Sequence, residues 1–488
     1  MLSLSDLPDL PAVPDTVKTT LSFAWTAYIA VLAVWIVLQK RSPLSTLSWI
    51  LSMAWLPVLG FGVYYFLGPQ RMRRQRVKRL RSHANLYAKS DFANLRALSD
   101  QAPQHLQQMG LLGHATCDIP VSTASDVRLL VGGAQTYNAL FEAIRAARHH
   151  VHLEYYIFEP DKIGTALRDL LVEKARQGVN VRLLVDALGS KRLGRRFFAP
   201  LEAAGAGVGL FHDSRIGRRL RPVINFRTHR KIVVCDGAVG FTGGLNITDE
   251  EDERTRPDAY HDVHLRLEGN AVRWLQMVFM EDWVYATGER KRRTAEDFDK
   301  LLRPTVVGEH AVQIVASGPD SEHEAIHRMM LAAINGAARR VWITTPYFVP
   351  GSPALMALTG AALRGVDVRV MVPMRSDSRI VSAAARSYFD ELIEAGAKVW
   401  EYEARMLHSK TMVVDGDCGV VGTANFDNRS FRLNYEICAF VYGPTLTVPL
   451  GAQFERDLRK SVRVEAHRPL PAWQKLFDAT ARLFSPLL

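Results

Sequence analysis

One pattern of histidine, lysine, aspartate and asparagine occurs twice in this sequence, and both copies have the same internal spacing. Its members are His229, Lys231, Asp236 and Asn246 in the first copy, and His408, Lys410, Asp415 and Asn425 in the second. Each asparagine closes a glycine-led string, Gly-Gly-Leu-Asn or Gly-Thr-Ala-Asn. One match to H-x-K-x-x-x-x-D is a weak signal, but two matches in register indicate an internal duplication. The sequence therefore predicts two halves that fold alike.

The segments around the two motifs also share an expected order of elements, judged from their apolar periodicity. The expected elements of the first half are helices at 140–147 and 166–177 and strands at 151–158 and 181–185. Those of the second half are helices at 325–333 and 354–363 and strands at 341–348 and 368–372. Alternating strands and helices favour an α/β fold, in which the copies either form separate sheets or pack face to face.

Longer strings around the motifs resemble a known family. They are residues 229–237, 241–250, 421–430 and 433–436. They are similar to the phospholipase D superfamily and, within it, to bacterial cardiolipin synthase, as are the leading apolar stretches and residues 483–488. The resemblance implies two duplicated phospholipase D-like α/β/α sandwich domains, packed with pseudo-twofold symmetry. It departs from the family at Glu251, where an aromatic residue is expected; we interpret Glu251 as a loop position that does not affect catalysis.

The predicted domains follow from this resemblance and from the composition of the chain. Residues 119–303 and 304–488 are the two phospholipase D-like domains, and the second includes an amphipathic C-terminal tail. Residues 1–68 hold an N-terminal hairpin of two transmembrane helices, and residues 69–118 form a basic juxtamembrane linker.

The duplicated motif supplies the groups needed to cleave a phosphodiester without a metal. One imidazole would attack phosphorus to give a phosphohistidine, while the other acts as general acid and then as general base. Lys231 and Lys410 would bind the non-bridging oxygens. The amides of Asn246 and Asn425 would assist them. Because each half supplies only one motif imidazole, we expect the halves to share a single site.

Each imidazole needs a partner on its other ring nitrogen, which fixes its tautomer. By position, Asp236 and Asp415 are candidates at a strand end or turn. The resemblance implies instead that these two aspartates brace the backbone, and that Asp262 and Glu436 orient the imidazoles. The strings G-x-x-x-x-G-K-[ST] and H-E-x-x-H do not occur, and the four cysteines form no C-x-x-C pair. We therefore expect no cofactor and no metal.

The N-terminal region predicts a membrane anchor. Residues 21–38 and 44–67 carry no charge and are each about long enough to cross a bilayer. A dense run of arginine and lysine follows at 71–81, which by the positive-inside rule places the later domains in the cytoplasm. Two buried helices of a soluble domain are the alternative. The family resemblance implies a multi-pass protein of the bacterial inner membrane.

Two further segments have a mixed basic and apolar character. Residues 191–221 interleave arginines with residues such as Phe197 and Phe198, as an anionic lipid surface would require, or form a solvated basic loop. The tail has Trp473, Leu476 and Phe477 at helical spacing, and either lies at the membrane interface or packs on the second half.

The resemblance implies a cardiolipin synthase that joins two phosphatidylglycerol molecules and releases glycerol. The net charge of +11, from 61 Lys and Arg against 50 Asp and Glu, favours anionic lipid partners. No nucleic acid is expected, and the oligomeric state is not predicted. The same site also suits a phospholipase D-type hydrolase, a transferase with another alcohol acceptor, or, less readily, a nuclease. A lipid-binding protein with a decayed site is a non-catalytic alternative.

Overall fold

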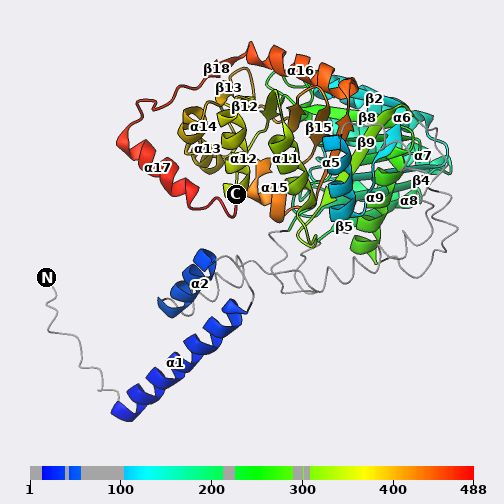
Figure 1. Ribbon diagram of the computed structural model, residues 1–488. Helices are drawn as coiled ribbons and strands as arrows, with labels where there is room; N and C mark the ends of the chain where they lie inside the picture. Colours follow the sequence, from blue (N-terminus) through cyan, green and yellow to red (C-terminus); the bar gives the residue numbers. More distant parts are fainter. Residues whose placement is uncertain (1–13, 39–42, 56–103, 213–225, 289–300, 302–307) are drawn as a thin grey trace, which may run out of the picture. The chain divides into compact units, whose positions relative to one another are not determined.

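The computed structural model describes residues 14–38, 43–55, 104–212, 226–288, 301 and 308–488. They belong to two compact units. The first comprises Met1–Arg71 with Leu220–Pro222, and the second comprises Met72–Arg219 with Val223–Leu488. Both duplicated halves lie in the second unit (Figure 1).

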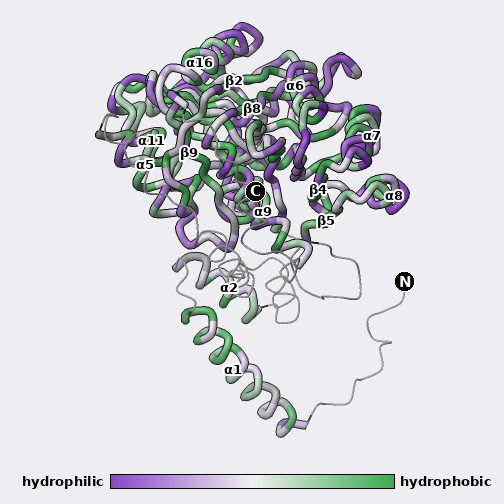
Figure 2. Tube along the Cα trace, turned by 90° about the vertical axis from the view of Figure 1, so that its right-hand side faces the viewer, coloured by the Kyte–Doolittle hydropathy of each residue, from purple (hydrophilic) through white to green (hydrophobic). Residues whose placement is uncertain are grey.

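The described residues of the first unit form the helices α1 (Asp15–Val37) and α2 (Pro43–Trp55), which pack against each other at Ile36 and Met53. Helix α1 covers most of the first predicted span, and Figure 2 colours much of it as hydrophobic. None of the helices formed by the described residues is both long and apolar enough to cross a membrane. The rest of the second predicted span, 56–67, and the basic run at 71–81 lie outside the described residues.

The first half of the second unit forms a seven-stranded mixed sheet, in the order β2-β8-β7-β6-β3-β4-β5. Its strands are β2 (Asp126–Val131), β3 (His150–Tyr155), β4 (Asn180–Asp186), β5 (Gly207–Phe211), β6 (Ile232–Cys235), β7 (Val239–Gly243) and β8 (Val263–Glu268). Its helices are α6 (Gly132–Ala146), α7 (Lys162–Arg176), α8 (Arg195–Ala203), the 3₁₀ turn η3 (Asp249–Glu251) and α9 (Ala271–Thr287).

The second half forms a nine-stranded sheet, in the order β1-β9-β17-β15-β14-β10-β12-β13-β18. Its strands are β1 (Ser122–Ala124), β9 (His310–Ser317), β10 (Arg340–Thr344), β12 (Asp367–Pro373), β13 (Lys398–Tyr402), β14 (Thr411–Val414), β15 (Cys418–Gly422), β17 (Glu436–Tyr442) and β18 (Ser461–Arg463). A small separate sheet pairs β11 (Phe348–Val349) with β16 (Phe426–Asp427). Its helices are α5 (Gln104–Cys117), α11 (Ala325–Gly336), α12 (Ser352–Leu363), α13 (Arg379–Arg386), α14 (Phe389–Glu394), α15 (Asn428–Arg432), α16 (Pro444–Leu458) and α17 (Ala472–Arg482).

The two sheets have the same topology. Strands β9-β17-β15-β14-β10-β12-β13 repeat the order of β2-β8-β7-β6-β3-β4-β5, and corresponding neighbours pair in the same direction. In each sheet three neighbouring strands run parallel, β3-β4-β5 in the first and β10-β12-β13 in the second. The strands beside them pair antiparallel. The duplication predicted from the motifs is thereby confirmed, and the expected helices and strands around them are present.

The two lobes pack face to face over a shared apolar core. One hydrophobic cluster contains residues of both sheets, such as Ile232 and Leu265 from the first and Val413 and Ile437 from the second. Helix α9 contacts strands of its own sheet and also β9, and α16 contacts its own sheet and also β2. Each lobe has a further core beneath its outer helices. Figure 1 shows this stacking of layers.

Local sequence explains why these elements begin where they do. The side chain of Asp161 accepts a hydrogen bond from Gly164 N at the start of α7, and Ser378 caps α13 in the same way. Central strand β17 reads Glu-Ile-Cys-Ala-Phe-Val-Tyr and is buried throughout, as expected for a strand covered on both faces.

Two segments lie elsewhere than their position in the chain suggests. Strand β1 precedes the first sheet but pairs antiparallel with β9 of the second, and α5 packs on α11 and β9. The part of the predicted linker from residue 104 is thus a helix of the second lobe; the exact limits 119–303 and 304–488 stay a prediction.

Phe197 and Phe198 are buried in the first lobe rather than presented to lipid, because α8 packs its apolar face inward. Of the basic segment 191–221, residues 213–221 lie outside the described residues.

Arg230, the central residue of the first His-x-Lys string, fastens the lobes together. Its guanidinium is buried and forms a short ion pair with Asp282 on α9 of the same lobe. It also donates to the backbone oxygens of Glu436 at 3.1 Å and Ser317 at 3.2 Å in the other lobe. Such a buried, multiply bonded guanidinium fixes geometry, and its loss leaves a buried carboxylate without its cation.

We expect Arg230→Met to lower the thermal unfolding midpoint strongly, by the equivalent of about 3–5 kcal/mol, because Asp282 stays buried without its ion-pair partner. The double variant Arg230→Met/Asp282→Leu should recover most of this loss, since both charges are removed together. Arg128→Met is the control: Arg128 is 63% exposed in its pair with Asp126 and its loss should shift stability little. A double variant as unstable as the single one would contradict this account.

Candidate active site

The two motif histidines are held by strand-like pairing between the lobes. His229 N donates to Tyr435 O at 2.9 Å, and His408 N donates to His261 O at 2.8 Å. Tyr435 and His261 each precede a carboxylate, Glu436 or Asp262. The same backbone hydrogen bond between the lobes therefore occurs twice, related by the pseudo-twofold axis. Each one places an imidazole next to a carboxylate of the opposite lobe.

The His229 imidazole has a single possible tautomer when neutral. Its Nδ1 lies 3.0 Å from Glu436 Oε2 and 3.0 Å from the backbone oxygen of Thr423. Both partners are acceptors, so Nδ1 carries the proton and donates it to them. Burial lowers the pKa of His229, partly offset by Glu436. The neutral ring consequently has a free lone pair on Nε2.

The Glu436 carboxylate is fully buried and nevertheless held in its ionised form. Burial favours the neutral acid, but His229 and then Lys231 and Thr423 outweigh it, and the pKa of Glu436 lies below its ordinary value. The Thr423 hydroxyl donates to Glu436 Oε2 at 2.6 Å, and Asn434 Nδ2 donates to Oε1 at 3.2 Å. Hydrogen bonds to the charged form stabilise it.

The His408 imidazole has a different setting. Its Nδ1 lies 2.7 Å from Asp262 Oδ2 and 3.9 Å from Glu251 Oε1. Burial raises the pKa of Asp262 to about 6, against the opposing effect of Lys410, and burial also raises the pKa of Glu251. Burial and the nearby Lys410 place the pKa of His408 well below its ordinary value. The carboxyl groups of Asp262 and Glu251 thus both lie near the His408 imidazole and the Lys410 ammonium.

One position in the glycine-led strings differs between the two carboxylate settings. In the second lobe Thr423 supplies a hydroxyl to Glu436, whereas the equivalent residue of the first lobe is Gly244. A Cβ at Gly244 would lie only 2.0 Å from Asp262 Oδ1. Asp262 therefore approaches the backbone where a side chain would otherwise be, and it receives no hydroxyl donor from that position.

The two motif lysines are buried beside the imidazoles. Lys231 Nζ donates to the backbone oxygen of His229 at 3.0 Å, and Lys410 Nζ donates to that of His408 through a short contact. Burial, and then repulsion from Lys410, lowers the pKa of Lys231 to about 7; burial also lowers the pKa of Lys410. An anion bound between them would favour the charged form of both.

The motif aspartates contact the backbone and neither imidazole. Asp236 accepts hydrogen bonds from the N–H groups of residues 148–150, at 2.7–2.9 Å, and Asp415 accepts from those of residues 338–340, at 2.7–2.9 Å. Both aspartates have positive φ, 56° and 52°. These bonds lower the pKa of each aspartate against the effect of burial. Each aspartate fixes the turn that leads into β3 or β10.

The two motif asparagines are not equivalent. Asn246 Nδ2 donates to Glu251 Oε1 at 2.8 Å, so this amide is engaged within the protein rather than turned to a phosphate. The residue five positions after Asn425 is Ser430, which accepts from Asn425 N at 3.1 Å. Asn425 Oδ1 is buried and makes no hydrogen bond to the described residues. Asn425 is the asparagine whose side chain remains available to a ligand.

The departure at Glu251 was expected to leave every candidate site position unaffected, but Glu251 is bonded to one of them, Asn246. The Glu251 side chain is 1% exposed, holds Asn246 through both N and Nδ2, and reaches toward His408. Sequence reasoning missed it because a third acidic residue after Asp249 and Glu250 resembles a solvated turn. Its spacing of five from Asn246, matched by Ser430 after Asn425, was the available signal.

Two aromatic rings that the sequence did not single out border the imidazoles. Tyr156 meets His229 edge-on with ring centroids 5.1 Å apart, and Tyr260 lies 5.7 Å from His408. Lys231 Nζ also lies 5.8 Å from the Tyr156 ring centroid. These rings restrict each imidazole and limit the water around it.

One group of described residues has the donors of a metal site. Ligand atoms of Glu251, Asp262 and His408 lie within 4.8 Å of one another. The same cluster already contains a cation, because Lys410 Nζ is 3.7 Å from Asp262 Oδ2. The imidazole N–H and this ammonium balance the carboxylates.

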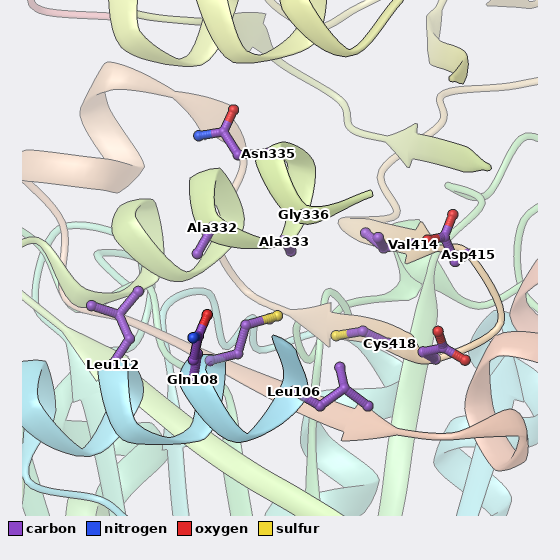
Figure 3. A pocket seen from close by; sticks show the side chains of 12 residues that line it. Leu106, Gln108, Leu112, Ala332, Ala333, Asn335, Gly336, Val414, Asp415 and Cys418 are labelled. Atoms are coloured by element: carbon purple, nitrogen blue, oxygen red, sulfur yellow. The ribbon is translucent and has the colours of Figure 1, made fainter. Parts of the chain in front are cut away.

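A separate cavity of about 420 Å³ lies behind the second motif (Figure 3). It is bounded by α5, α11 and the turn between β14 and β15, and its lining includes Asp415 but neither His408 nor Lys410. Because its lining is mostly apolar and lacks both motif histidines and both motif lysines, this cavity is not part of the candidate active site.

The family model described as "Cardiolipin synthase, PLD-like domain" matches residues 140–283 and 330–458, which contain both motifs. A cardiolipin synthase of Geobacillus sp. (strain WCH70) is 40% identical over 477 residues, 96% of this chain and 94% of the relative. The chain belongs to the cardiolipin synthase family. Cardiolipin synthase 1 of Bacillus anthracis is 37% identical over 486 residues, with the same coverage. A second model, "Phospholipase_D-nuclease N-terminal", matches residues 29–69.

A solved structure supports the fold of this cardiolipin synthase family member. The crystal structure of phosphatidylserine synthase from Haemophilus influenzae Rd KW20 superposes with a TM-score of 0.61 at 13% identity. It covers 78% of this chain and all of that one. At this identity the likeness shows the fold alone.

Thr423→Val removes the hydroxyl donor of Glu436 while keeping the shape of the side chain, so the pKa of Glu436 should rise. A hydrogen bond to a charged group contributes about 1.5–3 kcal/mol, or roughly one to two pH units. The acidic limb of phospholipid turnover should therefore move to higher pH by about that amount, and the difference should vanish as pH rises further. Rate measurements across pH test this.

Thr447→Val is the matched control for that substitution. Thr447 is equally buried, but its hydroxyl donates to the backbone oxygen of Gly416, away from the imidazoles. Thr447→Val should leave the pH dependence of phospholipid turnover unchanged. Identical profiles for the two variants would show that Thr423 does not control Glu436.

Proposed function

We propose that this protein transfers a phosphatidyl group from one phosphatidylglycerol to another, giving cardiolipin and glycerol, through a phosphohistidine on His229. The family supplies the reaction class, phosphatidyl transfer between phospholipids. The observation that carries the residue assignment is the crossed pairing, in which each imidazole is oriented by a carboxylate of the other lobe.

In the first half-reaction, Nε2 of His229 attacks the phosphorus of phosphatidylglycerol. The bond from phosphorus to the glycerol oxygen breaks, and His408 gives its Nε2 proton to the departing oxygen. Glycerol leaves, the phosphatidyl group remains bound to His229 through a phosphorus–nitrogen bond, and His408 becomes neutral.

The second half-reaction reverses these roles. His408 accepts the proton of a headgroup hydroxyl on the second phosphatidylglycerol, whose oxygen attacks phosphorus and displaces His229. One phosphodiester has then been broken and one formed, so no nucleoside triphosphate is needed. The enzyme returns to its starting protonation state.

The different surroundings of the two imidazoles support His229 as the nucleophile. Glu436 stays ionised and holds the Nδ1–H tautomer, which leaves Nε2 of His229 free to attack. His408 has two carboxyl groups near Nδ1, an arrangement that supports an imidazolium once the charge of the lysines is balanced.

A bound phosphodiester would balance the charge of the two buried lysines. Lys231 and Lys410 repel each other and are desolvated, so an anionic phosphodiester between them lowers the free energy of both ammonium groups. It also reduces their effect on His408, whose pKa should rise in the substrate complex. Asn425 Nδ2 is the further donor we assign to the phosphate, because the equivalent amide nitrogen of Asn246 is already bonded to Glu251.

We further propose that the N-terminal region anchors the enzyme in the bacterial inner membrane, as a multi-pass segment with the catalytic domains in the cytoplasm. The uncharged stretches 21–38 and 44–67, and the basic run that follows them, support this arrangement. Anchoring raises the local concentration of acceptor lipid relative to water as the competing nucleophile.

A substrate with a good leaving group separates the roles of the two histidines. Phosphatidyl-p-nitrophenol releases p-nitrophenolate without protonation, so His408→Ala should still release it in a burst and retain a covalent phosphatidyl adduct. His229→Ala should give neither burst nor adduct, because its nucleophile is absent. Stopped-flow absorbance and mass spectrometry of the quenched protein measure both. An adduct on the His229→Ala protein would reverse the assignment.

The acceptor is tested with phosphatidylglycerol as the sole lipid, in the presence of a chelator. Cardiolipin and glycerol should appear in equal amounts, and both should be lost in His229→Ala. Phosphatidic acid as the main product would identify a hydrolase instead. Activity that disappears with the chelator and returns with a divalent cation would contradict metal-free catalysis.

A further inference from the structure

Helix α17 is amphipathic, and its polar side faces the protein. Asp478 is only 5% exposed and accepts two hydrogen bonds from Arg386 on α13, at 2.6 and 3.0 Å. Tyr388 OH donates to Ser485 Oγ at 2.8 Å, and Arg482 donates to the backbone oxygen of Ser387 at 3.0 Å. The helix is therefore fixed to the second lobe by ionic and polar contacts.

The apolar side of α17 faces outward as a consequence. Trp473 is 70% exposed and Leu476 69%, and Phe477, Leu483 and Phe484 are also exposed. A surface helix of a globular protein normally has the opposite orientation, with its apolar stripe toward the core. A contiguous exposed apolar patch of this kind marks a binding surface. Figure 1 shows α17, in red, at the edge of the second lobe beside α13.

A basic groove of about 850 Å³ adjoins this stripe. Residues 374–376 after β12 and the start of α13 form one wall, and α17 forms the other. Arg375 and Arg379 are exposed in this wall and make no hydrogen bond or ion pair with any described residue. The single acidic residue of α17, Asp478, is buried and paired with Arg386, which also lines the groove. The groove thus combines free cations with aromatic and aliphatic side chains.

We propose that the α17 face, defined as Trp473, Leu476 and Phe477 with Arg375 and Arg379, docks on an anionic phospholipid leaflet and holds one lipid in its groove. The two guanidinium groups bind the lipid phosphate, and the apolar side chains enter the interfacial layer, where tryptophan is favoured. A leaflet is favoured over a second protein copy because the apolar side chains of α17 are bordered by two exposed arginines that pair with no described residue. The lining of this groove includes none of the motif histidines, lysines or asparagines.

Asp377 lies next to the groove wall and carries its charge toward the surroundings of His408. Ser376, in the groove wall, donates to Asp377 Oδ1 at 3.1 Å, and Tyr347 OH donates to the same carboxylate at 2.7 Å. Asp377 in turn acts electrostatically on Tyr260, whose ring lies beside His408.

The experiment places an environment-sensitive fluorophore on the α17 face of the full chain. A Cys117→Ser background leaves only the buried Cys235, Cys418 and Cys438. Leu476→Cys is labelled in one protein, and Val448→Cys in the control. Val448 is 64% exposed on α16, which lies well apart from α17 in Figure 1. Both proteins are reconstituted into nanodiscs of phosphatidylglycerol or phosphatidylcholine that contain doxyl-labelled lipid.

Doxyl lipid should quench the label at 476 and shift its emission to the blue, with the larger effect in phosphatidylglycerol, and should leave the label at 448 unchanged. A label at 476 that does not respond to lipid overturns the proposal. So does a blue shift that grows with protein concentration in lipid-free detergent, which would identify a contact between copies. Neither readout depends on turnover, so the result stands apart from the catalytic assignment.

Kinetics in mixed micelles give a second readout. Near an anionic surface each cation contributes about 1 kcal/mol, or roughly a fivefold change in affinity. Arg375→Gln and Arg379→Gln should each raise the apparent KM for phosphatidylglycerol by about fivefold with kcat unchanged. Arg459→Gln, an exposed arginine on the C-terminal side of α16, is the control and should change neither constant. A fall in kcat with KM unchanged would overturn the lipid-docking role.

Discussion

The catalytic centre depends on one exchange between the lobes: the imidazole of each motif donates to a carboxylate that belongs to the other half. His229 is bonded to Glu436, and His408 to Asp262. Since both carboxylates are fully buried, neither lobe can place its histidine correctly without the shared core that brings the sheets face to face. The fold and the chemistry are therefore fixed by the same interface.

The duplicated motif is symmetric in sequence but not in its electrostatics. Thr423 donates a hydrogen bond to Glu436, whose pKa is lowered mainly by His229 and Lys231, whereas Gly244 only makes room for Asp262. Glu251 adds a second carboxyl group beside His408, and its counterpart in the second lobe is Ser430. These few substitutions are enough to give two chemically similar imidazoles different partners and thus different tasks.

The sequence predicted the duplication, the order of strands and helices and the residues that converge on the site, because motif spacing and apolar periodicity are local properties. It did not predict which carboxylate faces which histidine, since spacing along the chain carries no information about the opposite lobe. Glu251 was misread for a related reason, as its burial arises from packing around His408. Likewise β1 joins the second sheet, although it precedes the first in the chain.

The face-to-face packing of two like lobes has the geometry of an isologous dimer contained in a single polypeptide. In a true homodimer, any change at one position would appear on both sides of the axis at once. Joining the halves removes that restriction, so Gly244 and Thr423 can differ although they occupy the same place in their lobes. Covalent linkage is thus what permits the two motif histidines to acquire different surroundings, as the proposed division into a nucleophile and a proton donor requires.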